Sequence, residues 1–111
     1  MSKYDRGIVD LELNGTAYQL CPTAHVMERI DKEFGSTLDA FQSLARPTIQ
    51  SVSLIVLYGS YLDSEQLGQV KEDVFQQGLM NVVGKIAPFI EALLDPNGNA
   101  GDLGEGDEGK G

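Results

Sequence analysis

The chain has 111 residues, which is the length of one domain and is enough to bury a core without help from a metal or a disulfide. Its formal net charge is −9 and no cluster of lysine and arginine is present, which argues against nucleic acid or an anionic membrane as a partner. The single cysteine, Cys21, has no second cysteine to pair with, and the N-terminus lacks the apolar core of a signal peptide, so we expect a cytoplasmic protein.

The first element that the sequence predicts is a β-hairpin. Apolar residues alternate with acids in the run VDLEL before Asn14-Gly15, and the extended, apolar-rich run TAYQL follows. Asn-Gly between two such runs is typical of a type I′ turn, because both residues tolerate a positive φ. Two strands alone are only marginally stable in water, so one face of the hairpin is expected to lie on helices.

Two helices are predicted after the hairpin. Thr23 is the expected N-cap of the first helix, which continues to Phe34 with Gly35 in the left-handed position after its end. Charged pairs four residues apart on its other face indicate a solvated surface without catalytic meaning. Ser36 or Thr37 is expected to cap a second, short helix that ends before Pro47 and has an apolar stripe of Leu38, Phe41, Leu44 and Ala45.

The stretch from Thr48 to Leu62 contains no charged residue and is predicted to be the central helix of the domain. A segment without charge is expected to be buried on most of its sides. Pro47 precedes its first turn, and Gly59-Ser60 mark its expected end. The stretch is shorter than the roughly 20 residues that cross a bilayer.

Two further helices are predicted. Asp63 or Ser64 is expected to cap an amphipathic helix that runs to Gly78, and the last helix spans residues 79–94, with Pro88 expected to kink it. The apolar arc of this last helix covers about half of its circumference, more than the roughly 100° that contact with a core requires. We therefore expect part of the arc to bind a partner through Met80, Ile86, Phe89 and Ile90; the alternative is that the short helix, the hairpin or a second copy of the chain covers the same surface.

The composition changes after the last helix to a glycine-rich and acidic run. We predict a single domain over residues 1–94 and a disordered tail over residues 95–111, because the run has too few apolar residues to offset the entropy of ordering it. Gly104, Gly106 and Gly109 match a dinucleotide-binding pattern, but no strand precedes them. Asp95, Asn97 and Asn99 match the start of a calcium-binding loop, but Ala100 and Gly106 stand where that loop requires a glycine and a glutamate.

No catalytic or metal-binding set is evident in the sequence. Cys21 and His25 lie four residues apart, but no second histidine or cysteine is present to complete a zinc site. The same scarcity argues against a cysteine nucleophile, and the carboxylates are expected on solvated helix faces or in the tail. The sequence therefore predicts a protein that is not an enzyme and that uses no cofactor and no metal.

The order of these segments resembles a known family. Arg6-Gly7, the VDLELNGTAYQL hairpin, a helix that ends in Phe34-Gly35-Ser36, the uncharged helix and the LDSEQL start of the next helix are similar to the small tail assembly chaperones of tailed phages and gene transfer agents. The expected fold is α+β and mostly α, with an N-terminal β-hairpin on about four to five helices. The resemblance implies binding to the tape measure protein, recruitment of the tail tube protein in the cytoplasm of a bacterial host, and absence from the finished virion.

Two other functions remain open at this point. A structural component of the phage tail, such as a tube or terminator subunit, would need long edge strands for ring assembly, and the sequence predicts only one hairpin. An acidic protein-binding regulator would carry its carboxylates as a stripe on the folded body, whereas many of the acids here lie in the tail. A tape measure gene immediately downstream would favour the chaperone.

Overall fold

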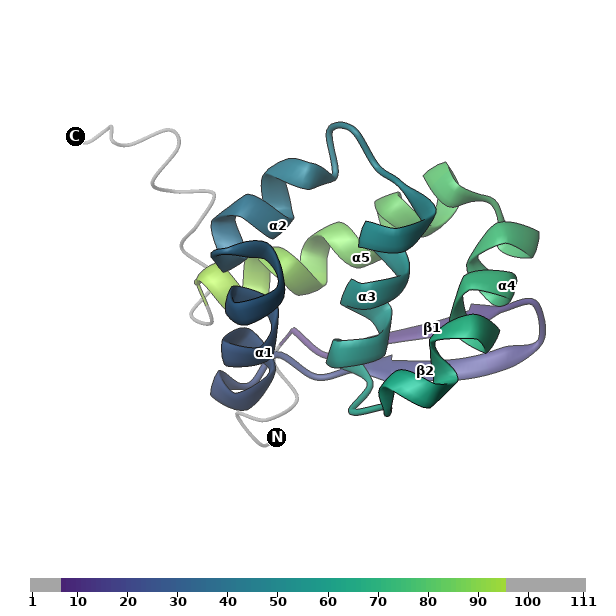
Figure 1. Cartoon of the computed structure of the whole chain (residues 1–111), viewed down its shortest axis with the longest axis horizontal. Helices are drawn as coiled ribbons and strands as arrows, with labels where there is room; N and C mark the ends of the chain where they lie inside the picture. Colours follow the sequence, from purple (N-terminus) through teal and green to yellow (C-terminus); the bar gives the residue numbers. More distant parts are fainter. Residues whose placement is uncertain (1–6, 96–111) are drawn as a thin grey trace.

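The computed structural model describes residues 7–95 and shows an antiparallel hairpin followed by five α-helices (Figure 1). This confirms the predicted α+β, mostly helical fold. The predicted tail lies outside the described residues, apart from Asp95. The elements in chain order are β1 (Val9–Leu13), β2 (Thr16–Leu20), α1 (Ala24–Phe34), α2 (Thr37–Ser43), α3 (Ile49–Gly59), the 3-10 turn η2 (Ser64–Gln66), α4 (Leu67–Gln77) and α5 (Leu79–Leu94).

The hairpin forms as the Asn-Gly signal predicts. Asn14 and Gly15 both have positive φ, 53° and 83°, and Leu13 pairs with Thr16 across the turn. Strand alternation sends one set of side chains into the core and the other set to solvent. The inward set is Leu11, Leu13, Tyr18 and Leu20, all buried.

Helix α3 is the centre of the fold, as its lack of charge predicts. Every side chain from Val52 to Leu57 is buried, because α3 contacts α1, α2, α4, α5 and β2. Its first turn is capped by Thr48 and Ser51, which exchange hydrogen bonds between side chain and backbone.

The end of α3 has a different physical cause from the one expected. Gly59 is the last helical residue, but its φ is not positive; a Cβ there would lie 2.8 Å from the ring of Phe89 and 3.0 Å from Leu20. The left-handed residue that ends the helix is Tyr61, with a φ of 60°. Leu62 N–H then donates to the Leu57 carbonyl at 3.0 Å, as in a Schellman motif. Gly59 is therefore required by close packing, and Tyr61 reverses the chain.

The first two helices begin where the sequence predicts, with Thr23 and Ser36 as N-caps. The expected apolar stripe of α2 is wrong at Leu38, which is 50% exposed. Thr37 is buried in its place, because the Asp31 carboxylate accepts hydrogen bonds from its N–H at 2.6 Å and its hydroxyl at 2.7 Å. Helix α2 also ends earlier than expected, at Ser43.

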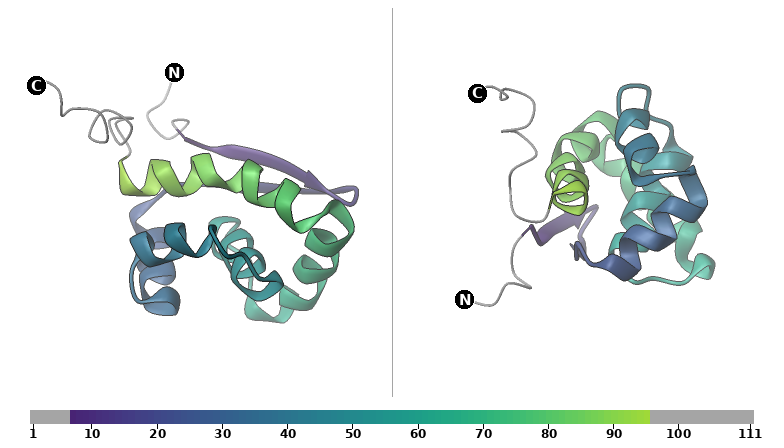
Figure 2. Two further views of the ribbon diagram at one scale, coloured as in Figure 1. Left: turned by 90° about the horizontal axis from the view of Figure 1, so that it is seen from above. Right: turned by 90° about the vertical axis from the view of Figure 1, so that its left-hand side faces the viewer.

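Helix α5 has the predicted bounds and continues through Pro88. It runs along the hairpin on one side and contacts α2, α3 and α4 on others (Figure 2). This position, between a strand and three helices, determines which of its apolar side chains a partner could reach.

Candidate functional site

The predicted partner surface on α5 is largely inside the molecule. Ile86, Phe89 and Ile90 have no solvent exposure, so the expectation that they form an accessible surface is wrong for this conformation. The wide apolar arc is needed because the neighbours of α5 cover several of its sides. Met80, at the first turn, is 66% exposed, and partner binding through it stays a prediction.

The other side chains singled out in the sequence do not form a metal site. Cys21 is a half-buried free thiol, and His25 stacks on Tyr61 with ring centroids 5.8 Å apart. Within residues 7–95, no group of three or more histidine, cysteine or acidic side chains could hold a metal ion. The glycine pattern and the remainder of the calcium-loop pattern lie outside the described residues.

A buried carboxylate that the sequence analysis missed fastens the hairpin to α4. Asp73 is fully buried, and Tyr18 donates its hydroxyl proton to Oδ2 at 2.5 Å. Oδ1 accepts from the side-chain amides of Gln69 at 2.9 Å and Asn14 at 3.3 Å. The expectation that every carboxylate is solvated is therefore wrong for Asp73. We call Asn14, Tyr18, Gln69 and Asp73 the hairpin latch.

The hydrogen bonds of the latch determine its electrostatics. Burial by itself raises the pKa of Asp73, but donors from Tyr18, Asn14, Gln69 and Thr16 outweigh burial and hold the pKa below its ordinary value. Burial, the hydrogen bond to Asp73 and the negative charge there raise the pKa of Tyr18. Both groups stay in their ordinary charge states at neutral pH, so we interpret the latch as structural.

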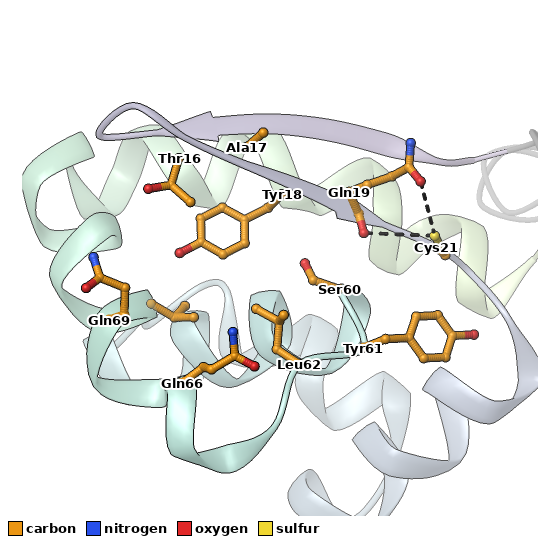
Figure 3. A pocket seen from close by; sticks show the side chains of 11 residues that line it. Thr16, Ala17, Tyr18, Gln19, Cys21, Ser60, Tyr61, Leu62, Gln66 and Gln69 are labelled. Carbon is orange, nitrogen blue, oxygen red and sulfur yellow. Dashed lines mark hydrogen bonds between the residues drawn. The ribbon is translucent and has the colours of Figure 1, made fainter.

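A pocket of about 390 Å³ lies beside the latch, between β2 and the segment that joins α3 to α4 (Figure 3). It is lined by no charged residue. We call it the edge pocket, and its lining residues are Thr16, Ala17, Tyr18, Gln19, Cys21, Ser60, Tyr61, Leu62, Gln66, Gln69 and Val70.

One wall of the edge pocket is held in a strained conformation. A left-handed φ in a non-glycine residue costs on the order of 1 to 3 kcal/mol, and Tyr61 adopts one. Its ring is fixed by stacking on His25 and by a 2.6 Å hydrogen bond between its hydroxyl and that of Thr23. Next to it, the Ser60 hydroxyl is buried without a hydrogen-bond partner among the described residues. These contacts keep the wall in place without filling the pocket.

The opposite wall is the outer edge of β2. Because the two-residue turn makes Leu13 and Thr16 a hydrogen-bonded pair, the alternation of the ladder directs the backbone N–H and C=O of Ala17 and Gln19 away from β1. The next residue in this alternation is Cys21, and its N–H donates to the Gly59 carbonyl of α3 at 3.0 Å. In the described part of the chain the sheet has two strands, so β2 has a free edge.

The chemistry of the edge pocket favours binding over catalysis. Burial and the nearby negative charge of Asp10 raise the pKa of the Cys21 thiol, which makes it a weaker nucleophile at neutral pH. The remaining polar groups of the pocket are hydroxyls, amides and backbone groups, which bind by hydrogen bonding. Sequence reasoning predicted the strand, but the pocket depends on how the α3–α4 segment packs against it.

Comparisons with known proteins do not assign the chain to a family. No protein-family model matches the chain, and neither curated proteins nor solved structures yield a match. Among residues 7–95, no helix has the length and apolar character needed to cross a lipid bilayer.

Proposed function

We propose that this protein is a tail assembly chaperone of a tailed phage or gene transfer agent. In this role it binds the tape measure protein in the cytoplasm of a bacterial host, recruits tail tube subunits and leaves before the virion is complete. The observation that carries the proposal is the free β2 edge beside an uncharged pocket, because such a surface supports protein binding and contains no activated nucleophile or base. The resemblance of the segment pattern supplies the biological setting.

The two alternative functions receive less support from the same observations. A tube or terminator subunit needs long strands for ring formation, and each strand among the described residues has five residues. An acidic regulator would have acids lining its binding site, whereas the acids near the edge pocket, Asp10, Asp63 and Glu65, lie outside its lining.

Co-expression tests the proposal. The chain should co-purify with the tape measure protein of the same phage or gene transfer agent and, in its presence, with the tail tube protein, as measured by affinity purification followed by size-exclusion chromatography with light scattering. Neither protein co-purifying with the folded chain would contradict the proposal.

Two serine substitutions on α5 test whether Met80 contributes to this binding. Met80→Ser should leave folding intact because the side chain is exposed, and it should weaken binding if the start of α5 is part of the interface. Phe89→Ser is expected to disrupt folding, because Phe89 is fully buried. Tape measure binding that is unchanged in folded Met80→Ser would show that Met80 does not contribute to the interface.

A further inference from the structure

We propose that the edge pocket binds an extended, basic segment of a partner protein, which adds to β2 as a third strand of the sheet. The inference deepens the proposed function, because it names the chemistry and the geometry by which a partner is held. It rests on three observations: the direction of the backbone groups of β2, the pocket beneath the added strand, and the charges around both.

The backbone of β2 offers a template for strand addition. Ala17 and Gln19 direct their N–H and C=O groups outward. Among the described residues, the Cys21 thiol donates to the Gln19 carbonyl at 3.9 Å. An incoming strand could therefore form about four backbone hydrogen bonds. The added strand cannot pair with β2 beyond this point, because the Cys21 N–H already donates to the Gly59 carbonyl of α3. The site is thus one short strand in length.

The two edges of the hairpin differ in how they are protected. On the solvent face, β1 carries Asp10 and Glu12, and charged side chains on an edge strand commonly prevent strand addition. Their cross-strand partners on β2 are Gln19 and Ala17, which are uncharged. The β2 edge is therefore the unprotected one.

The pocket lies where the side chains of an added strand would point. Figure 3 shows Leu62, Gln66 and Gln69 across from the free edge of β2, with Tyr61 toward the Cys21 end. Alternate side chains of the added strand would enter this space, and the others would face solvent. A volume of about 390 Å³ leaves room for such side chains, and the amides of Gln66 and Gln69 can bond to polar ones.

A partner segment fits this space better than a second copy of the chain. Antiparallel pairing of β2 with β2 of another copy would place both inner sheet faces on the same side. Each copy would then bring its own wall of residues 60–69 to the space that the other wall occupies, together with its Asp63 and Glu65. Two chains with a formal net charge of −9 each would also repel one another.

The charges around the pocket select a basic segment. Asp10 bonds to Gln19 at 3.0 Å, and Asp63 and Glu65 belong to the segment that forms the opposite wall. Lys71 follows the lining residue Val70, but the helical period places it on the other side of α4 from Gln66 and Gln69. A segment with lysine or arginine would therefore be attracted, and an acidic one would be repelled.

A pair of matched proline variants tests the geometry. Ala17→Pro removes an outward N–H of β2, whereas Glu12→Pro removes the outward N–H of its cross-strand partner on β1. The probes are two amidated heptapeptides of alternating valine and threonine; one peptide also carries two lysines and the other carries two glutamates. Their binding is measured by calorimetric titration. The lysine peptide should bind the natural chain and the Glu12→Pro variant with similar affinity. It should bind the Ala17→Pro variant about tenfold more weakly.

Charge variants at one position test the chemistry of the segment, and they are useful if a proline variant fails to fold. Gln19→Lys should weaken binding of the lysine peptide by about tenfold and Gln19→Glu should retain it, while the glutamate peptide should bind the natural chain about tenfold more weakly. Amide exchange of Ala17 and Gln19 should slow in the complex, and that of Asp10 and Glu12 should not change.

The possible outcomes separate this inference from the proposed function. No binding of the lysine peptide, equal binding by both proline variants, or a dimer that Ala17→Pro converts to a monomer would each overturn the inference. Tape measure binding that is insensitive to Ala17→Pro and Gln19→Lys would leave the chaperone proposal intact and overturn the inference. Peptide binding without any tape measure binding would do the reverse.

Discussion

The polar groups on the two sides of strand β2 differ in their hydrogen bonding. On the inner side, at the tip, the hairpin latch gives the buried carboxylate of Asp73 donors from Asn14, Tyr18 and Gln69. On the outer side, the backbone of Ala17 and Gln19 faces a pocket, and Ser60 has a buried hydroxyl without a partner among the described residues. One five-residue strand is thus held in the fold by hydrogen bonds on its inner side, while its outer side is accessible for binding.

The latch also explains how a free edge is tolerated. A two-stranded hairpin is marginal by itself, and hydrogen bonds between its tip and α4, together with its buried apolar face, hold it in register. Because the register is held from inside, the outer edge does not need a third strand to stay formed. Two substitutions and a change of pH test this contrast.

Asp73→Ala is expected to have the largest effect on stability. It would leave the buried Tyr18 hydroxyl and the side-chain amides of Asn14 and Gln69 without their acceptor, at a cost of about 3 kcal/mol in the free energy of unfolding. Urea denaturation followed by circular dichroism measures this loss.

The neighbouring residue provides the control. Glu72→Ala removes an exposed carboxylate bonded to Gln76 and should change stability by less than about 0.5 kcal/mol. Equal effects of the two variants would show that the latch does not hold the hairpin.

Acidification is expected to have a smaller and graded effect. The folded-state pKa of Asp73 lies below its ordinary value of about 3.9, so its contribution to stability is fully present above that value and is lost as the pH falls through the folded pKa. Asp73→Asn removes this titration. The difference in unfolding free energy between the natural chain and Asp73→Asn should therefore be constant from about pH 7 to pH 5 and shrink below about pH 4. A difference that persists undiminished at the acidic end would contradict the lowered pKa.

Gln19→Lys is expected to have the smallest effect, although it lies on the same strand. The Gln19 side chain is exposed and bonds to Asp10, to which a lysine could also bond, so stability should change by less than about 0.5 kcal/mol. Thermal unfolding measures the change. A large loss of stability would show that the outer side of β2 contributes to folding and does not serve binding alone.

Features that depend on neighbours along the chain could be predicted from the sequence. Asn14-Gly15 specifies the turn because both residues accept a positive φ, and Thr23, Ser36 and Thr48 cap helices by accepting from the backbone N–H three residues ahead. The uncharged run of α3 indicated the centre of the fold, since no charge there requires solvent.

Features that depend on segments distant in sequence became visible in the folded structure. Tyr18 and Asp73 are 55 residues apart, and one clue to the burial of Asp73 is its helical spacing from Val70 and Val74. Phe89 is buried because the hairpin and three helices surround α5, which an apolar arc cannot distinguish from a binding surface. The edge pocket exists because Tyr61, in a conformation that its residue type disfavours, turns the chain after α3 toward α4 and leaves β2 uncovered. Hydrogen bonds within a turn or a cap are encoded locally, whereas burial and open edges depend on which distant surfaces meet.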